Sequence, residues 1–293
     1  MRNRDVAKAL LRQYTPFRDQ LRGLKRYFVP YVPNAAHSDF ALNDGLAMLA
    51  AIRQAGGPVA GRVLEIGTGW TPIIPMLFHL GGANAITLTD LDRLYDETSA
   101  PSAVALLRAN GERVQRALGL SGAELEAGFA SFAPDYLCPW NPAGQDEASV
   151  DLVISRAVLE HIPPGMLTQL FGELRRIIRP GGYMCHSVDN TDHWQHGPHG
   201  RGLADFLRHD SAGLRWKIAS LNKHGYVNRL RHSDYLAAAA DAGWEIVLES
   251  AQVPPETLAQ VQRMQDLGEV APQFRHYAAD DLAATATLMV VRH

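Results

Sequence analysis

The segment that decides the fold runs from Val63 to Trp70 and reads Val-Leu-Glu-Ile-Gly-Thr-Gly-Trp. It is a short apolar strand that leads into a glycine turn, and 21 residues after Gly69 a second apolar stretch ends in Asp90. Glycines at such a turn let the backbone bend tightly and approach a ligand, while the carboxylate can accept hydrogen bonds from ribose hydroxyls. The arrangement predicts a nucleoside cofactor.

The turn departs from the dinucleotide fingerprint G-x-G-x-x-G at two points. Its sixth position is Pro72, and the bulky Trp70 beside it leaves little room for a diphosphate. Glu65, two residues before the glycines, would repel a diphosphate but could hold an ammonium group. A cofactor with adenine, ribose and an amino-acid end therefore fits better than NAD. Thr71 as N-cap and Pro72 as the first helical residue predict that a helix follows.

Four stretches between about residues 60 and 190 form an ordered set of motifs. The first is acid-x-G-x-G, starting at Glu65, and the second is the acid that closes the next strand, Asp90. The other two are residues 149–162, which contain Leu-Glu-His-Ile, and residues 174–183, which end in Pro-Gly-Gly-Tyr. Together they resemble the motifs of class I S-adenosylmethionine-dependent methyltransferases.

This resemblance implies a Rossmann-like, seven-stranded, mostly parallel sheet and S-adenosyl-L-methionine as the cofactor. It implies that Glu65 positions the amino-acid end of the cofactor and that Asp90 binds the ribose, with the adenine near the start of the loop after the third strand. The cofactor-binding residues expected from it are Glu65, Gly67, Thr68, Gly69, Asp90, Ala130, Ser131, Phe132, Ser155 and Arg156.

Strand-like and helix-like segments alternate from about residue 60, which predicts an α/β fold with parallel strands and right-handed crossovers. Strands are expected at residues 62–67, 85–90, 125–130, 150–155 and 182–188, followed by 244–249 and 286–291, which the resemblance makes an antiparallel pair at the sheet edge. Helices are expected at residues 72–80, 101–118 and 166–178. A later helix should begin with Ser233 as N-cap and end at Gly243.

We predict an N-terminal helical cap over residues 1–58 and a cofactor-binding domain over residues 59–293, with a cap inserted at residues 189–232 before the last helix. Apolar residues near the N-terminus recur at three- and four-residue spacing, which predicts amphipathic helices. They are Val6, Leu10, Tyr14, Phe17, Leu21 and Leu24. These helices either cover the sheet edge or close as a lid over the cofactor, and the sequence leaves both open.

Composition indicates a soluble enzyme. A chain of 293 residues, 46% of them hydrophobic, can bury one large core or a core plus a cap. The net charge of −3 gives no attraction to nucleic acid or membrane, and the two cysteines form neither a metal-like pair nor a disulfide framework. Signal-peptide and membrane-spanning patterns are absent from the sequence. We expect a cytoplasmic enzyme of small-molecule metabolism, and nothing in the sequence indicates its oligomeric state.

Two histidines follow strands at the edge where ligands of open α/β sheets bind. His161 comes after the expected fourth strand and His193 after the fifth. A histidine of near-neutral pKa can take the proton from an attacking hydroxyl or amine. We predict both as candidate catalytic bases and prefer His161, for which a structural role beside the cofactor is the alternative.

The spacing of His193, His196 and His199 also invites a metal site. Histidines that chelate from one helix need i, i+4 spacing, however, and Gly197 and Pro198 oppose a regular helix. We therefore predict no metal and interpret this loop as polar and substrate-facing.

Residues 200–235 are rich in basic side chains, with aromatic residues between them. The basic residues are Arg201, Arg208, Arg215, Lys217, Lys223, Arg229 and Arg231. No nucleic-acid-binding module is recognisable. One or two of these arginines would suffice to clamp a small anionic substrate, and a solvated basic face is the alternative.

The sequence thus predicts methyl transfer to an O or N atom of a small molecule, anionic if the basic insertion faces it. One alternative is an enzyme that consumes the cofactor without methyl transfer, by intramolecular cyclisation or aminocarboxypropyl transfer, and releases methylthioadenosine. A non-catalytic binding module is disfavoured because the polar residues near the cleft are present.

Overall fold

The structure is a computed structural model that describes residues 35–195, 200–220 and 226–293. The amphipathic helices predicted near the N-terminus lie outside these residues, as do His196 and His199.

Seven strands form one sheet in the order β3-β2-β1-β4-β5-β7-β6. Their bounds are β1 Gly61–Ile66, β2 Ala83–Thr89, β3 Asp135–Leu137, β4 Val150–Arg156, β5 Ile178–Asp189, β6 Glu245–Gln252 and β7 Ala286–Arg292. Strands β1 to β5 pair in parallel, and β7 runs antiparallel to both β5 and β6. The predicted seven-stranded, mostly parallel sheet is confirmed, including its antiparallel edge pair.

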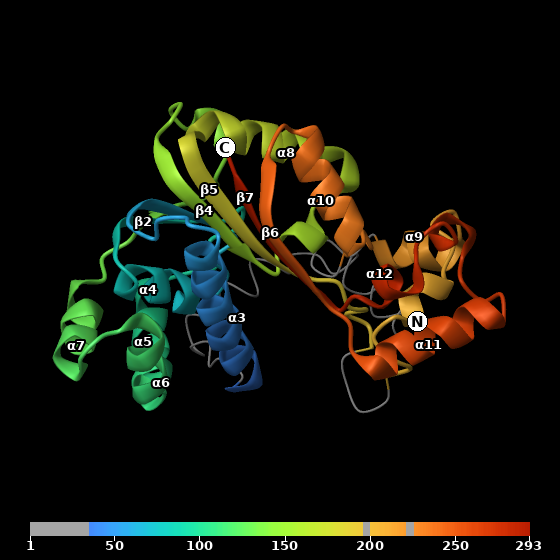
Figure 1. Ribbon diagram of the computed structural model, residues 1–293, viewed down its shortest axis with the longest axis horizontal. Coiled ribbons are helices and arrows are strands. Elements are labelled where there is room, and N and C mark those ends of the chain that lie inside the picture. The colour runs from blue at the N-terminus through green and yellow to red at the C-terminus, as the bar shows by residue number, and fades with distance from the viewer. Residues whose placement is uncertain (1–34, 196–199, 221–225) are drawn as a thin grey trace, which may run out of the picture.

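Helices cover both faces of the sheet (Figure 1). One layer contains α3 Ala35–Gln54, α4 Ile73–Leu80, α5 Ala100–Ala109, α6 Gly111–Leu118 and α7 Gly122–Ser131; the other contains α8 Pro164–Ile177 and α10 His232–Asp241. Side chains of successive strand residues enter opposite layers, as Leu152 and Val153 of β4 do. A sheet buried on both faces explains why the middle strands are continuous apolar runs.

Helix α3 belongs to the main core. Its Leu42, Met48 and Ile52 are at most 1% exposed and pack with residues of α4 and the sheet. This part of the predicted N-terminal cap therefore covers the sheet. Residues 1–34 lie outside the described residues, so the alternative of a lid over the cofactor stays a prediction.

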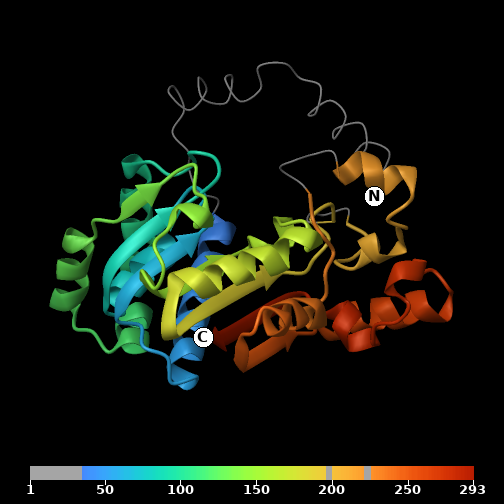
Figure 2. The same ribbon diagram turned by 90° about the horizontal axis from the view of Figure 1, so that it is seen from above.

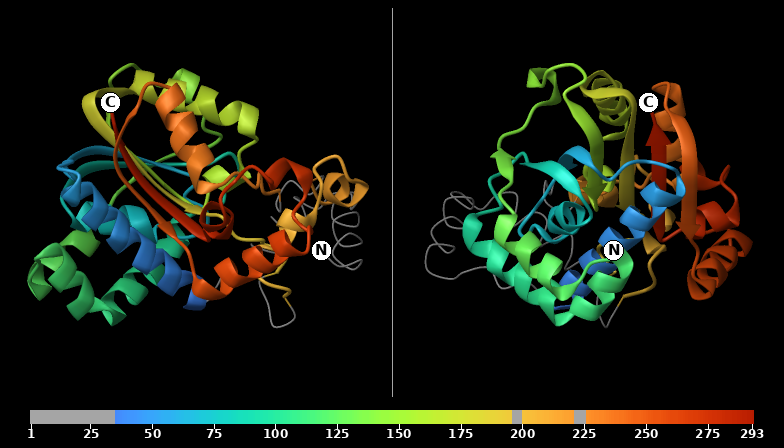
Figure 3. Two further views of the ribbon diagram at one scale, coloured as in Figure 1. Left: turned by 45° about the vertical axis from the view of Figure 1, so that its right-hand side comes forward. Right: turned by 60° about the vertical axis from the view of Figure 1, so that its left-hand side comes forward.

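A third hydrophobic cluster is formed by segments of the chain that lie beyond the carboxyl end of β5, and Figures 2 and 3 show the position of these segments. It joins two segments that are distant in sequence, the described parts of residues 190–231 (190–195, 200–220 and 226–231) and residues 253–285, and we call them together the accessory lobe. The lobe contains η4 Asp205–Arg208, α9 Leu214–Ser220, α11 Pro255–Asp266, η5 Pro272–Phe274 and α12 Ala279–Ala283. The predicted cap insertion thus packs against a second excursion between β6 and β7, which the sequence analysis did not single out.

The predicted third strand was wrong. Residues 125–130 lie in α7, and the third strand is Asp135–Leu137. The cause is a capping box: Ser121 Oγ accepts from Glu124 N at 3.2 Å, and the Glu124 carboxylate accepts from Ser121 N at 2.8 Å. This Ser-x-x-Glu pattern starts a helix, and it was readable in the sequence.

Three helix boundaries also differ from prediction. The expected helix at residues 101–118 is broken at Asn110 into α5 and α6. Pro72, and not Thr71, is the N-cap of α4. Helix α10 begins at His232 because Asp234 accepts from the backbone of Arg231 at 2.7 Å, so Ser233 lies inside the first turn. Within the described residues, none of the helices has the length and hydropathy of a membrane-spanning segment.

Candidate functional site

The turn after β1 is held against the end of β2. Backbone amides of Gly67 and Thr68 both donate to Thr89 O, at 2.9 and 3.1 Å. Gly67 and Gly69 have φ of +70° and +67°, values that glycine adopts without strain. A Cβ on Gly67 would lie 2.5 Å from Val158 Cγ2, whereas one on Gly69 would meet nothing within 4 Å. The turn is therefore tight on the Val158 side and open at Gly69, where a ligand has room.

Glu65 is a buried acid beside this turn, only 4% exposed. Burial raises the pKa of Glu65 to about 8, although nearby Thr68 lowers it in part and the charge of Asp90 adds to the rise. Glu65 Oε2 and Thr68 Oγ1 are both buried without a hydrogen-bond partner. Buried polar atoms are nearly always paired, and an ammonium group would satisfy both oxygens. These residues fit the amino-acid end of the expected cofactor.

Asp90 follows β2 and faces the same turn. Its Oδ2 accepts from Gly69 N at 3.0 Å and its Oδ1 from Leu91 N at 2.8 Å. Burial raises the pKa of Asp90, although these two amides oppose the rise. A carboxylate has about four acceptor sites, so Asp90 can still accept from ribose hydroxyls.

The three residues predicted to contact adenine lie at the end of α7 instead of after a strand. Ser131 Oγ lies 3.0 Å from His79 Nε2, and the Phe132 ring meets the His79 ring edge-on at 5.5 Å between centroids. Ala130 precedes them in the same last turn. The sequence argument for these residues assumed a strand at 125–130, so that premise is removed.

The loop that does follow the third strand starts at Cys138 and runs beside Asp90. Trp140 N donates to Asp90 O at 2.9 Å, and Asp90 N donates to Leu137 O at 3.3 Å. Leu137, the last residue of β3, is 38% exposed. Sequence analysis missed this stretch because β3 is only three residues long.

The side chains of Ser155 and Arg156, at the end of β4, both interact with residues of other elements. Ser155 is fully buried and its Oγ lies 2.7 Å from His186 Nδ1 of β5. Arg156 Nε lies 2.6 Å from Asp44 Oδ2 of α3. Because the charge of Arg156 also lowers the pKa of Glu65, its guanidinium lies near the cofactor side. Their role in cofactor binding stays a prediction.

His161 and His193 lie side by side, with ring centroids 5.3 Å apart. His161 ends the short helix η3, Leu159–His161, and its Nδ1 lies 2.6 Å from Tyr226 O. Because a carbonyl can only accept, Nδ1 carries the proton and Nε2 the lone pair. Burial lowers the pKa of His161 despite this hydrogen bond.

His193 is paired with Asp189, the last residue of β5, at 3.2 Å from Nε2 to Oδ2. Burial alone would lower the pKa of His193, but the surrounding acids, Asp189 first among them, raise it. Burial would raise the pKa of Asp189, yet His193 and Thr191 hold it well below its usual range.

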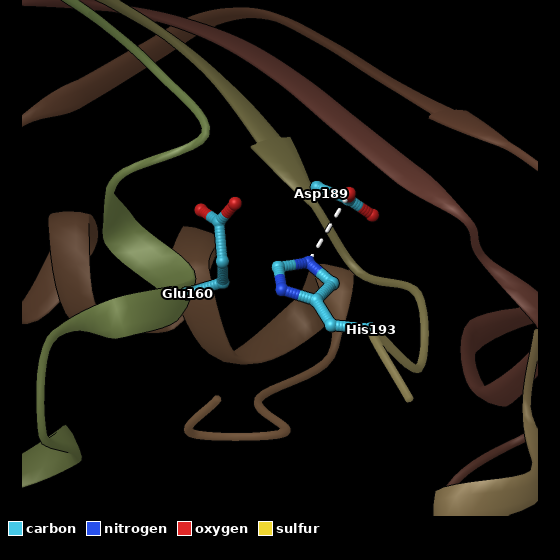
Figure 4. A group of neighbouring side chains, drawn as sticks. All are labelled: Glu160, Asp189 and His193. Atoms are coloured by element: carbon cyan, nitrogen blue, oxygen red, sulfur yellow. Dashed lines mark ion pairs between the residues drawn. The ribbon is translucent and has the colours of Figure 1, made fainter. Parts of the chain in front are cut away.

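Glu160 is a second buried acid, next to this pair (Figure 4). It is 1% exposed, and burial raises its pKa to about 8 even though the backbone amides of Glu160 and Asp189 oppose the rise. Both carboxylate oxygens of Glu160 are buried without a hydrogen-bond partner. Ligand-type atoms of Glu160, Asp189 and His193 all lie within 4.8 Å of one another. Sequence analysis assigned no role to the two acids, because they come together only when β4 and β5 pair.

Two of the basic residues proposed to clamp an anion are structural. Arg229 is 3% exposed and donates to Phe206 O and His209 O, at 3.1 and 2.5 Å. Arg231, 1% exposed, donates to the carbonyls of Arg229, Asn190 and Leu282. Both guanidiniums stabilise the accessory lobe and are not available to a substrate.

A third basic residue of the lobe, Arg208, also interacts with neighbouring side chains. Arg208 pairs with Asp205 and Glu269, and it lines a cavity of about 470 Å³ next to α11. None of the strand-end residues lines this cavity, which is part of the lobe. By contrast, Asn228 of the lobe supports the histidine site directly: its N donates to Glu160 O at 2.7 Å, and its Nδ2 to the carbonyls flanking Glu160 and His161 at 2.8 and 2.9 Å.

Comparison with known proteins gives a family but no curated relative. The profile of a family described as a methyltransferase domain matches residues 39–249. A search among curated proteins found no match.

Solved structures resemble the chain at low identity. One is an S-adenosylmethionine-dependent methyltransferase from Mesorhizobium loti, with 17% identity over 85% of this chain and 99% of that chain and a TM-score of 0.46. A second is phosphoethanolamine N-methyltransferase 2 from Haemonchus contortus, with 18% identity over 84% of this chain and 52% of that chain and a TM-score of 0.43. A third is a putative sarcosine dimethylglycine methyltransferase from Galdieria sulphuraria, with 14% identity over 88% and 85% and a TM-score of 0.45. At such identities the likeness says nothing of the substrate.

Proposed function

The chain belongs to the methyltransferase-domain family and is an S-adenosylmethionine-dependent class I methyltransferase, and we propose that it methylates an oxygen or nitrogen atom of a small molecule bound beside His161 and His193. The observation that supports this proposal is the position of the histidine pair. It lies after β4 and β5, and β4 is the direct neighbour of β1, which leads into the cofactor turn. Val158, three residues before His161, packs against Gly67 of that turn.

S-adenosylmethionine is the cofactor. When bound, it supplies an electrophilic methyl group: an acceptor lone pair forms the bond to this carbon, and the electrons of the carbon–sulfur bond remain on sulfur. Glu65 would hold its ammonium group, since a buried carboxylate with an unpaired oxygen is matched by a cation. Asp90 would accept from the ribose hydroxyls, and the open space at Gly69 would admit the ligand beside the backbone.

His161 is the better candidate for the base that takes the acceptor proton. Its Nδ1 is bound to Tyr226 O, so the lone pair of Nε2 is the one available. Its lowered pKa keeps the ring neutral near pH 7, as a base must be. His193 is the second candidate, but its pairing with Asp189 favours the protonated ring, which is the wrong form for a base.

The acceptor is better described as a small hydroxyl or amine compound than as an anion. Arg229 and Arg231, two of the seven basic residues considered as anion clamps, donate to backbone carbonyls instead. We place the reaction in small-molecule metabolism and the enzyme in the cytoplasm.

The test is the nucleoside product. Purified protein is incubated with S-adenosylmethionine and a metabolite extract, and the products are separated by chromatography. Adenosylhomocysteine that forms only when extract is present supports methyl transfer to a small molecule. Methylthioadenosine instead would refute it in favour of cofactor consumption without methylation.

A further inference from the structure

We propose that Glu160, Asp189 and His193 bind a divalent first-row transition-metal ion, with Mn²⁺ the best match, at the carboxyl edge of β4 and β5. The histidine spacing in the sequence predicts no metal, but that prediction considered ligands from one loop. The three residues come from η3, from the end of β5 and from the loop after it, and their side chains converge (Figure 4).

The spacing of the three groups is close to that of metal ligands. Two donors bound to one ion at about 2.1 Å lie roughly 3.0–3.4 Å apart, depending on the coordination angle. His193 Nε2 and Asp189 Oδ2 already lie 3.2 Å apart. All three donor atoms fit within 4.8 Å, so Glu160 needs a side-chain shift on the order of 1 Å to complete the set.

The buried carboxylate of Glu160 is a second observation that points to a bound cation. It is 1% exposed and neither carboxylate oxygen has a hydrogen-bond partner. A buried carboxylate without a partner is costly, and proteins rarely keep one without a reason. His161 Nε2 lies 4.0 Å from Glu160 Oε1, which is beyond hydrogen-bond distance. Asn228 fixes the backbone of Glu160, whose carboxylate lies within 4.8 Å of the donor atoms of Asp189 and His193.

Two carboxylates and one imidazole favour Mn²⁺ over Mg²⁺, and this ligand set differs from the thiolate ligands of many structural Zn²⁺ sites. Carboxylates suit Mg²⁺, Ca²⁺ and Mn²⁺, while imidazole suits the transition metals, and Mn²⁺ accepts both. Three protein ligands leave coordination positions open. The side chains of Asp189 and His193 are 32% and 23% exposed, so the open positions face outward from the buried Glu160.

The role of the ion rests on the proposed function. A divalent ion here would lower the pKa of an acceptor hydroxyl beside His161. His161 Nε2 would then take the proton and pass it to solvent, while the acceptor oxygen forms its bond to the methyl carbon. His161 itself is left out of the ligand set, since the base must keep its lone pair.

The binding test needs neither substrate nor cofactor. The full chain is treated with chelator, and MnCl₂ alone is added in a calorimetric titration, with MgCl₂ in parallel. We expect one Mn²⁺ per chain and weaker binding of Mg²⁺. Loss of an outer partner of a ligand costs 10–100-fold in affinity, so Glu160→Gln and Asp189→Asn should each lose at least about 100-fold. Glu249→Gln is the matched control, because it removes a carboxylate from another histidine pair, 2.8 Å from His232, and should bind Mn²⁺ normally.

Pulsed electron paramagnetic resonance of wild-type protein with Mn²⁺ keeps the test valid if a variant fails to fold. Coupling to one imidazole nitrogen, abolished in His193→Gln, is the expected result. Wild-type protein that binds no Mn²⁺, or binds it without nitrogen coupling, would overturn the site, as would unchanged affinity in Glu160→Gln. S-adenosylmethionine binding is measured separately. If S-adenosylmethionine does not bind, this result counts against the methyltransferase proposal alone. If added Mn²⁺ does not change the turnover rate, the ion has no activating role, although the metal site itself stands.

Discussion

The turn after β1 and the histidine region after β4 and β5 each contain a buried acid with an unpaired oxygen, but they are built in different ways. Glu65 and its neighbours form one contiguous stretch whose glycines adopt positive φ. Glu160 meets Asp189 and His193 only through strand pairing, and it is supported by Asn228 from the accessory lobe. Local backbone chemistry thus specifies the first region, and tertiary structure specifies the second.

The two acids also differ in the cation that suits them. Glu65 lies beside an open turn with a threonine hydroxyl, which suits an ammonium group that accompanies a larger ligand. Glu160 lies within reach of a second carboxylate and an imidazole, which suits a compact ion. In both regions, therefore, the groups that surround the buried acid determine which cation suits it.

The largest effect is expected in the histidine region. His161→Ala should lower turnover by ~10²–10⁴ while S-adenosylmethionine binds almost as before, because general-base catalysis contributes that much to rate. Steady-state kinetics and calorimetry measure the two effects. His232→Ala, at the histidine paired with Glu249, is the control and should keep full turnover. A small effect at His161 would mean that alignment alone drives the reaction.

The next effect concerns Glu65 and pH. Its pKa is about 8 in the folded protein against 4.5 in an exposed chain, so the folded state keeps a proton that the unfolded state releases. The stabilising contribution is complete below about pH 4.5 and is lost as the pH rises to about 8. By pH 7 the loss should reach about 3 kcal/mol.

Denaturant unfolding of cofactor-free protein from pH 5 to 8 tests this linkage. Glu65→Gln cannot ionise, so its stability should fall less over this range than that of the wild type. Glu249→Gln changes an exposed acid and should follow the wild-type curve. Parallel curves for wild type and Glu65→Gln would show that Glu65 is already ionised in the free protein.

A smaller effect is expected at the ribose side of the turn. Asp90→Ala should weaken S-adenosylmethionine binding by ~1.5–3 kcal/mol, the usual cost of losing a charged hydrogen-bond partner. The neighbouring acid offers a control, since Asp92→Ala should bind normally. Equal losses in both variants would indicate a general charge effect and would move the ribose contact away from Asp90.

The sequence predicted the parts of this molecule that depend on local pattern. The parallel strands and the glycine turn follow from apolar runs and from residues adjacent in the chain, while the seven-stranded sheet with its antiparallel edge pair was expected from the family resemblance. The third strand was misplaced because it is short and follows a helix whose capping box at Ser121 was overlooked. Arg229 and Arg231 were interpreted as candidate anion clamps or as part of a solvated basic face, since no sequence pattern reveals that backbone carbonyls of the lobe surround them. The grouping around Glu160 needs strand register, which single-sequence patterns do not contain.

The smallest expected effect distinguishes two possible positions of the adenine ring, one against the end of α7 and one against the loop that follows β3. Phe132 packs on His79 at the end of α7, whereas Leu137 is 38% exposed beside the backbone of Asp90. If the base lies against the loop that follows β3, Leu137→Ala should weaken S-adenosylmethionine binding about fivefold, on the order of 1 kcal/mol, because the apolar surface that covers the base is reduced. Phe132→Ala should destabilise the fold but leave affinity unchanged once the protein is folded. Calorimetry below the melting temperature of both variants measures this. The opposite result, with weaker binding only in Phe132→Ala, would restore the adenine position expected from the sequence and would mean that the end of α7 moves toward the cofactor when it binds.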